Sequence, residues 1–226
     1  FLPFLPAPAR FIMNLIGGSG KPKKGQKVEY QYATAIPIGT AIAQSFNLPL
    51  AESYGSIVGD EMERFGVHLW LAPALNIHRD IRCGRNFEYY SEDPLVSGKT
   101  AAAITRGVQR HPGCGTTIKH YAANNQEKNR YCNNSIVSER AMREIYLKGF
   151  GICVRESQPH ALMTSYNLLN GVHTSEHRGL IEDILRCEYG FKGIVMTDWI
   201  VDMAQDKQSL HRMPIAAEIA KAGGDL

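Results

Sequence analysis

The sequence predicts an α/β fold, specifically a (β/α)8 barrel of the TIM type, and two observations support this prediction. From about residue 33, short apolar runs alternate with longer amphipathic stretches, which is the pattern of strand–helix units in a parallel sheet. Polar and aromatic residues follow directly after four of the apolar runs, at Asn76–Arg79, Lys119–Asn125, Tyr166–Asn170 and Asp198–Trp199. In a parallel α/β barrel the strand ends gather around one mouth, so these residues are expected to share one site.

The individual elements follow from the same pattern. Strands are expected at Ala35–Ile38, Val67–Leu71, Thr116–Ile118, Ala161–Ser165 and Gly193–Met196. Crossover helices are expected at Leu50–Phe65, Pro94–Arg110, Ser138–Glu156 and Ser175–Tyr189. A last helix is expected at Met203–Gly223, and Gly224–Leu226 could start another strand. We therefore divide the chain into an irregular segment, residues 1–34, and a barrel domain, residues 35–226.

Composition argues against two classes of partner. The formal net charge of the 226 residues is +3, and Lys and Arg are scattered rather than gathered into a stripe, which disfavours nucleic acid. The one dense basic group, residues 21–27, lies among Gly and Pro and is typical of a solvated loop. No run approaches the roughly 20 apolar residues that span a bilayer. The apolar start Phe1–Gly20 holds three prolines and no basic beginning, unlike a signal peptide.

The cysteines and histidines predict neither disulfides nor a metal. The cysteine count is odd, no two are spaced as CxxC, and the domain is too large to need disulfides: Cys83, Cys114, Cys132, Cys153 and Cys187. We expect free thiols in a reducing compartment, and hence a cytoplasmic location. The eight histidines are dispersed without metal-ligand spacing, so we expect no metal ion and no organic cofactor.

The strongest candidate for chemistry follows the strand at Gly193–Met196, in the motif Thr197-Asp198-Trp199. Glycoside hydrolysis needs a carboxylate at the anomeric carbon, and sugar rings pack well on flat aromatic faces. Asp198 and Trp199 would supply both groups. Taken alone, however, an Asp after a strand is equally often a helix N-cap, and a lone Trp is more often part of the core.

Two further groups carry polar side chains suited to sugar hydroxyls. Lys119 and His120 come at the end of a predicted strand and could donate to neighbouring hydroxyls of one sugar. The Lys119 charge would also favour the ionised form of a nearby carboxylate. Arg85 follows a glycine in a polar and aromatic loop and could hold oxygens with its fork of donors. Without context, His120 is more often a hydrogen-bonded structural histidine. Arg85 could equally be a salt-bridged loop anchor.

Together these segments resemble the family-3 glycoside hydrolases, the β-glucosidase family. The resemblance runs from about Ala35 to Leu226 and rests on four segments: Asn76–Pro94, Lys119–Arg130, Met163–Asn167 and Val195–Trp199. It implies that Asp198 is the catalytic nucleophile and that Trp199 stacks on the sugar. It also implies sugar-binding or supporting roles for Arg85, Lys119, His120 and Arg130, contact with the nucleophile for Tyr166, and a place in the same subsite for Met163.

The departures from the family pattern matter as well. Family members usually carry an early Asp-Gly-Pro loop, whereas the first Asp here is Asp60, so the barrel is expected to be incomplete at its N-terminal end. In most of these β-glucosidases the general acid is a Glu in a following domain, which this chain is expected to lack. One branch, the β-N-acetylhexosaminidases, uses a Gly-His-Gly loop after Lys-His, and Tyr121–Asn125 does not match it.

The resemblance implies a retaining β-glucosidase that releases terminal non-reducing β-D-glucosyl residues from small glucosides. A β-xylosidase or another exo-glycosidase of the same family is an alternative, as is a sugar-binding fragment that has lost turnover. The partners expected are a small β-glucoside or oligosaccharide and either a second copy of the chain or a C-terminal domain that supplies the acid/base Glu.

Overall fold

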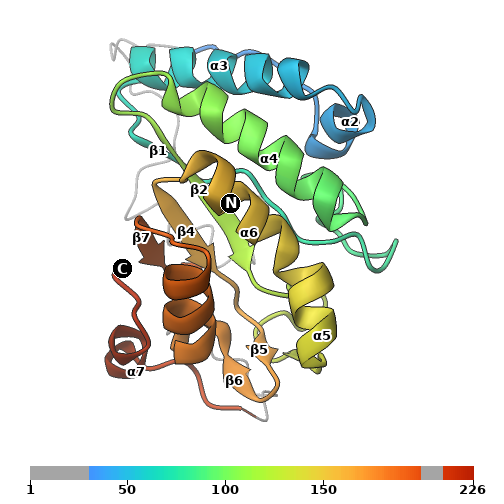
Figure 1. The fold of residues 1–226 in the computed structure, drawn as a ribbon, viewed down its shortest axis with the longest axis vertical. Coiled ribbons are helices and arrows are strands. Elements are labelled where there is room, and N and C mark those ends of the chain that lie inside the picture. Colours follow the sequence, from blue (N-terminus) through green and yellow to red (C-terminus); the bar gives the residue numbers. More distant parts are fainter. Residues whose placement is uncertain (1–30, 200–210) are drawn as a thin grey trace, which may run out of the picture. The chain divides into compact units, whose positions relative to one another are not determined.

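The computed structural model describes residues 31–199 and 211–226, and its compact unit is Ile36–Leu226. A parallel four-stranded sheet of order β1-β2-β4-β7 lies at its centre (Figure 1). The strands are β1 Leu69–Trp70, β2 Gly115–Tyr121, β4 Ala161–Thr164 and β7 Ile194–Met196. Because neighbouring strands follow one another along the chain and all run parallel, helical segments connect them on one face of the sheet.

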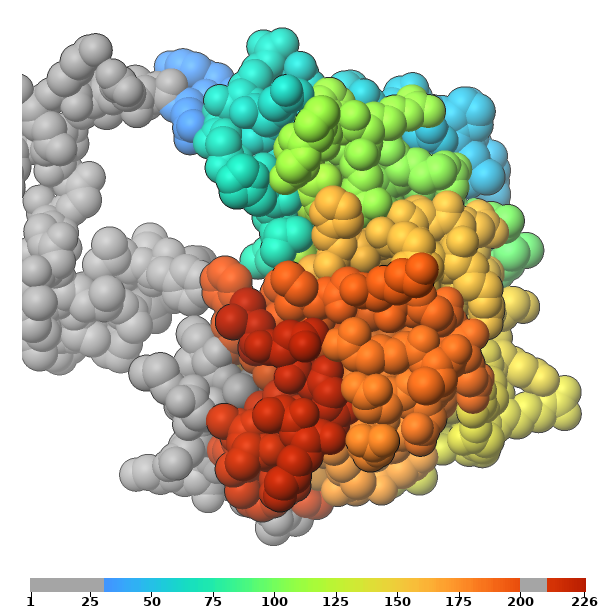
Figure 2. Space-filling view, turned by 60° about the vertical axis from the view of Figure 1, so that its left-hand side comes forward, coloured from blue at the N-terminus to red at the C-terminus, as the bar shows by residue number. Residues whose placement is uncertain are grey.

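The helices of the described residues follow one another along the chain, and Figure 2 shows successive segments packed side by side from green to red. They are α2 Gly39–Gln44, α3 Leu48–Phe65, α4 Pro94–Gln109, α5 Glu139–Ala141, the π-helix η2 Met142–Tyr146, α6 Lys148–Ser157, the 3-10 helix η3 Thr174–Glu176, the π-helix η4 Gly179–Glu188 and α7 Ala216–Lys221. A small second sheet joins β3 Asn134–Ser135, β5 Leu168–Leu169 and β6 Val172–His173. No helix among the described residues is long and apolar enough to cross a membrane.

The two long helices begin where the sequence supplies a cap. Asn47 accepts from the Leu50 amide at the start of α3, and Asp93 accepts from the Leu95 amide at the start of α4. Each cap satisfies an amide that has no partner within the helix, and a proline in the first turn needs none. The following apolar stripes then pack the helices together and against the sheet.

Two glycines allow α3 and α4 to approach at backbone distance. A Cβ placed on Gly107 would overlap the carbonyl oxygen of Glu52, and one on Gly55 would overlap that of Ile104. The main core lies between these helices, α6 and the sheet, and includes Ile104, Ile118 and Phe150. This core holds the strands whose carboxyl ends carry the candidate site.

The structure confirms the α/β class with a parallel sheet and corrects two predicted elements. Ala35–Ile38 forms no strand, because Pro37 lacks an amide hydrogen and no described segment pairs with it. The expected helix at Met203–Gly223 is confirmed at Ala216–Lys221 but not at residues 211–215. Residues 211–215 are not helical, since Pro214 disfavours helical geometry at Met213, and α7 begins only at Ala216. Residues 203–210 lie outside the described residues, as does the basic group at 21–27.

The remaining predicted elements agree with the structure in position. Four predicted strands overlap β1, β2, β4 and β7, and the stretch Ser138–Glu156 is helical but divided by η2. Gly224–Leu226 is not a regular strand, yet it pairs with β7: the Asp225 amide donates to Val195 O at 2.8 Å, and the Thr197 amide donates to Leu226 O at 2.8 Å. The described sheet is open, so a closed barrel stays a prediction.

Candidate active site

Three strand ends bring the predicted site residues together. Lys119 and His120 lie in β2, Tyr166 follows β4, and Asp198 follows β7. Because the three strands are parallel neighbours, their carboxyl ends face the same edge of the sheet. The Lys119–His120 peptide bond is cis. The structure thus brings these strand-end residues to one edge of the sheet, and their sharing a site stays a prediction.

Asp198 is the carboxyl around which the site is arranged. Its side chain is only 16% exposed, and its Oδ2 lies 3.8 Å from Nε2 of His120. Burial raises the pKa of Asp198, while the charges of Arg85, Arg130 and Lys119 oppose this rise. The predicted effect of Lys119 on the carboxylate is therefore present in direction, but burial outweighs it. The Trp199 amide donates to Oδ1 at 3.1 Å.

His120 is buried and held by Asn76. The Asn76 Oδ1 accepts from the His120 amide at 2.8 Å and lies 3.3 Å from Nδ1, while Asn76 Nδ2 donates to His120 O at 2.8 Å. Burial, followed by the charges of Arg85, Lys119 and Arg130, lowers the pKa of His120 well below its usual value. The imidazole is therefore neutral, and its contact with Asp198 is not an ion pair.

The partners of His120 also favour one tautomer. An amide oxygen such as Asn76 Oδ1 only accepts, so the hydrogen bond to it places the proton on Nδ1 and leaves a lone pair on Nε2. Nε2 and the carboxylate are then two acceptors too far apart to bond to each other. His120 thus presents an acceptor to the site, whereas the sequence suggested a donor.

Lys119 and Arg85 supply positive charge beside Asp198. Burial lowers the pKa of Lys119, and the charges of Glu88 and Asp198 counter this fall. Arg85 is mostly buried and pairs with Glu88 at 2.5 Å between Nη2 and Oε1. Arg85 is thus a salt-bridged residue of its loop, one of the alternatives considered, and its charge nevertheless acts on Asp198.

Arg130 and Tyr166 form a packed cluster on the other side of the carboxyl. The Arg130 guanidinium lies 4.9 Å from the centre of the Tyr166 ring and 5.1 Å from that of Tyr131. The Tyr166 hydroxyl donates to the carbonyl oxygen of Trp199, and its proximity to Asp198 lowers the pKa of that carboxyl. Burial and the Asp198 charge raise the pKa of Tyr166 itself, so its hydroxyl stays protonated and can donate.

Met163 and Trp199, the two remaining predicted site residues, differ in their exposure to solvent. Met163 is buried in an apolar cluster with Ala161 and Met196. Trp199 is 57% exposed, so its indole is available at the surface next to Asp198 rather than packed in the core.

The sequence did not single out the network that links the two halves of the site. Glu127 accepts from Arg130 Nη1 at 3.0 Å and from Asn124 Nδ2 at 3.2 Å. Asn124 also donates to the Tyr89 hydroxyl at 3.2 Å, which lies 3.4 Å from His120 Nδ1. The three-residue spacing of Glu127 and Arg130 is a signal for an ion pair that could have been noticed, whereas no local pattern points to Tyr89.

Arg79, a predicted strand-end residue, lies outside the candidate site. Asn76 and Arg79 were expected together at the mouth, but only Asn76 touches a site residue, and Arg79 lines a separate pocket. Within residues 31–199 and 211–226, no three His, Cys, Asp or Glu side chains are grouped so as to hold a metal ion.

Comparison with known proteins gives the site its family context. The model of the glycosyl hydrolase family 3 N-terminal domain matches residues 20–226. The β-glucosidase A of Butyrivibrio fibrisolvens is 48% identical over 166 residues, covering 74% of this chain and 20% of that protein. A β-glucosidase of Ruminococcus albus is 48% identical over 186 residues, covering 80% and 20%. The chain therefore spans about a fifth of the length of these relatives.

Solved structures of β-glucosidases are also similar to this chain. The β-glucosidase 3B of Thermotoga neapolitana, solved with glycerol and with glucose, matches with a TM-score of 0.81 and 46% identity. The match covers 91% of this chain and 27% of that one. The Bifidobacterium adolescentis β-glucosidase matches with a TM-score of 0.76 and 39% identity, covering 84% and 27%. On the sequence, the parallel sheet and these matches, the chain is β-glucosidase-like and belongs to glycosyl hydrolase family 3, whose N-terminal domain it matches.

Proposed function

We propose that this chain carries the nucleophile and most of the sugar-binding groups of a retaining β-glucosidase. The observation that carries the proposal is the surrounding of Asp198: a mostly buried carboxyl at the end of a parallel strand, with Arg85, Lys119 and Arg130 acting on its charge. A carboxylate so placed can attack an anomeric carbon, because the nearby cations hold it ionised despite burial. The relatives named β-glucosidase support glucose as the sugar.

In the proposed reaction, the Asp198 carboxylate forms a bond to the anomeric carbon as the glycosidic oxygen leaves with a proton from a general acid. Water then cleaves the glycosyl ester, and the configuration at the anomeric carbon is retained. His120 Nε2 accepts from a sugar hydroxyl, and Lys119 donates to one. Arg85 and Arg130 bind the sugar or orient the residues that do, and Tyr166 contacts the nucleophile. Trp199 stacks on the sugar ring, and Met163 lines the same subsite with its apolar side chain.

The general acid is proposed to come from outside the described residues. Glu88 pairs with Arg85 and Glu127 with Arg130, and a carboxylate held by arginine is unsuited to deliver a proton. Glu139, Glu144 and Glu92 are exposed on the surface. We also propose that the open sheet belongs to a (β/α)8 barrel, which the pairing of Leu226 with β7 supports. We further propose that the protein works in the cytoplasm, which the odd number and wide spacing of its cysteines support.

The test of the nucleophile uses a 2-deoxy-2-fluoro-β-D-glucoside with a good leaving group, followed by peptide mass spectrometry. We expect the label on Asp198, no label in Asp198→Asn, and normal labelling in Asp183→Asn, an exposed aspartate of η4. Labelling of another residue, or inversion seen by NMR of the product, would refute the mechanism. The rate of hydrolysis of the matching xyloside, measured in parallel, tests the β-xylosidase alternative. Labelling of Asp198 without turnover of either substrate would indicate an impaired sugar-binding fragment.

A further inference from the structure

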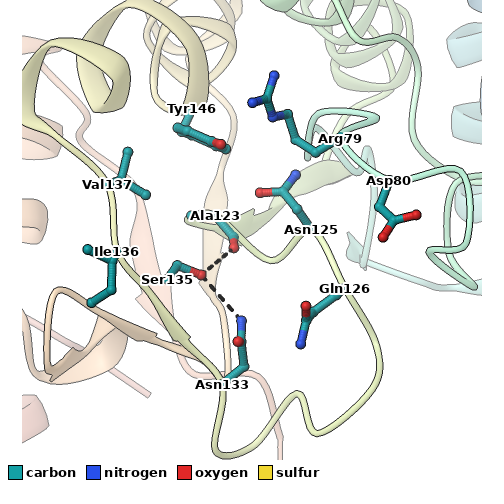
Figure 3. A pocket seen from close by; sticks show the side chains of 10 residues that line it. All are labelled: Arg79, Asp80, Ala123, Asn125, Gln126, Asn133, Ser135, Ile136, Val137 and Tyr146. Carbon is teal, nitrogen blue, oxygen red and sulfur yellow. Dashed lines mark hydrogen bonds between the residues drawn. The ribbon is translucent and has the colours of Figure 1, made fainter.

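A pocket of about 270 Å³ lies next to the loop that follows β2, and none of the candidate site residues lines it (Figure 3). Its wall combines one guanidinium, one phenol ring, three side-chain amides and two branched apolar residues: Arg79, Tyr146, Asn125, Gln126, Asn133, and the pair Ile136 and Val137. We call it the Arg79 pocket. The loop serves both places, since Asn124 faces the candidate site while Asn125 and Gln126 line the Arg79 pocket.

Two side chains of this pocket, Arg79 and Tyr146, have hydrogen-bond donors without a partner among the described residues. Arg79 forms no hydrogen bond or ion pair with any described residue, and its guanidinium lies 5.9 Å from the centre of the Tyr146 ring. The Tyr146 hydroxyl likewise has no hydrogen-bond partner within the described part of the chain. Figure 3 shows both side chains at the same end of the pocket. A guanidinium offers five N–H donors in a fixed plane, so this end is suited to a ligand with several oxygen atoms.

Acceptors are available on the remaining wall. The Asn125 amide nitrogen donates to Ile77 O at 2.6 Å, and that of Gln126 donates to Lys128 O at 2.9 Å. Both contacts orient the side-chain amide and leave its oxygen without a partner among the described residues. Asn133 is oriented in the same way, because its nitrogen donates to Ser135 Oγ at 3.4 Å. Three amide oxygens are thus left to accept from a ligand.

This combination fits a neutral sugar better than an anion. A sugar hydroxyl both donates and accepts, so it can use Arg79 at one end and the amide oxygens elsewhere. An anion only accepts, and it would face those oxygens and the carboxylate of Asp80, which also lines the pocket. Ile136, Val137 and the Tyr146 ring offer apolar surface to the C–H faces of a sugar ring. Pockets for drug-sized ligands begin at about 300 Å³, so this slightly smaller one suits a single pyranose.

We propose that the Arg79 pocket is a second carbohydrate site, which binds one pyranose unit of a neutral saccharide separately from the candidate active site. The proposal does not depend on the hydrolytic activity, because the pocket shares no residue with the group around Asp198. A site formed by so few contacts binds weakly, with a Kd on the order of 1 mM.

The experiment is an NMR titration of the ¹⁵N-labelled protein with methyl β-D-glucoside, following the side-chain amides of Asn125 and Asn133. We expect both signals to shift and to saturate. The variant Arg79→Ala with Tyr146→Phe keeps these reporters and the Tyr146 ring packing, and it should weaken the binding at least tenfold. The matched control Arg64→Ala changes an exposed arginine of α3 and should bind as the parent protein does. Lys119→Ala should also leave the shifts intact, which separates this site from the proposed catalytic one.

Three results would overturn the proposal. The first is an absence of saturable shifts at Asn125 and Asn133, or shifts that persist unchanged in the double variant. The second is an equal response to sorbitol, which carries similar hydroxyls without a ring face and would indicate unspecific polyol binding. The third is tighter binding of inorganic phosphate than of the glucoside, which would make the pocket an anion site.

Discussion

The carboxylate of Glu127 joins two halves of the candidate site: its Oε2 accepts from Arg130 Nη1 at 3.0 Å, and its Oε1 accepts from Asn124. Arg130 acts on the Asp198 charge, and Asn124 leads through Tyr89 to His120. One side chain that need not touch the sugar thus orients groups on both sides of the nucleophile. Its contribution is best tested by removing the charge while keeping the shape.

Glu127→Gln should lower kcat/KM by about tenfold to a hundredfold, since a hydrogen bond to a charged group contributes about 1.5–3 kcal/mol. The measurement uses a dinitrophenyl glucoside, whose leaving group needs little help from an acid. The control Glu144→Gln removes an exposed ion pair with Arg140 and should have no effect on kcat/KM. Equal kinetics for the two variants would mean that Glu127 is not a positioning residue.

Lys119→Ala and His120→Ala should each lower kcat/KM by on the order of a hundredfold or more, because their contacts with hydroxyls tighten in the transition state. Circular dichroism and thermal unfolding report whether the fold is kept, and His120→Asn serves as a second variant because His120 is buried. Near-normal kinetics in both Ala variants, with the fold intact, would place the site elsewhere.

Asp198 should make the protein less stable as the pH rises. Its pKa in the folded state is raised above the ordinary value of 3.8, so between these two pKa values the folded state binds more protons than the unfolded state. The free energy of unfolding therefore falls with rising pH across that window and stays reduced above it. Asp198→Asn removes this loss, and its Tm should exceed that of the parent at neutral pH.

The Tm difference should vanish below pH 3.8, where the parent carboxyl is protonated in both states. Asp183→Asn is the matched control at an exposed position and should follow the parent at every pH. A lower Tm for Asp198→Asn at neutral pH would show that the surrounding cations outweigh the burial of the carboxylate. The same raised pKa predicts that hydrolysis declines as the pH falls through it, since only the carboxylate attacks.

Gly107→Ala should destabilise the fold by about 1–3 kcal/mol, because the added methyl group meets the backbone of α3 at Glu52, which cannot rotate away. Denaturant unfolding measures the effect. Gly84→Ala is the control: its nearest neighbour would be Glu127 Cγ at 4.0 Å, so it should be nearly neutral. Similar unfolding midpoints for the two variants would mean that α3 and α4 can separate at little cost.

The 226-residue chain by itself should hydrolyse cellobiose slowly or not at all. Arginines hold Glu88 and Glu127, so neither is suited to act as the general acid within residues 31–199 and 211–226. General acid catalysis typically contributes a factor of about a hundred to ten thousand, and poor leaving groups depend on it most. The test compares this chain with one extended at both ends, on cellobiose and on a dinitrophenyl glucoside. Equal rates on cellobiose would place the acid within these residues.

Local patterns in the sequence were sufficient for the parallel α/β class, four of the strands and the motif that ends in Asp198. These features could be predicted because strand and helix periodicity, helix caps and polar strand ends each depend on residues that are close together in the sequence. The same patterns failed at Ala35–Ile38, where no partner strand is present among the described residues, and at residues 211–215, where Pro214 prevents the helix that begins at Ala216 from starting earlier. Arg79 shows the same limit, since its place in the chain beside Asn76 did not reveal that it lines a different pocket.

Only the tertiary structure decided the electrostatics and the connections of the site. The sequence could suggest that Lys119 favours an ionised Asp198, but the direction of the pKa depends on how far packing removes the carboxyl from water. The network from Arg130 through Glu127, Asn124 and Tyr89 to His120 joins residues up to 41 positions apart (130 − 89 = 41). Burial and such contacts arise when distant segments pack together, so no short stretch of the chain contains them.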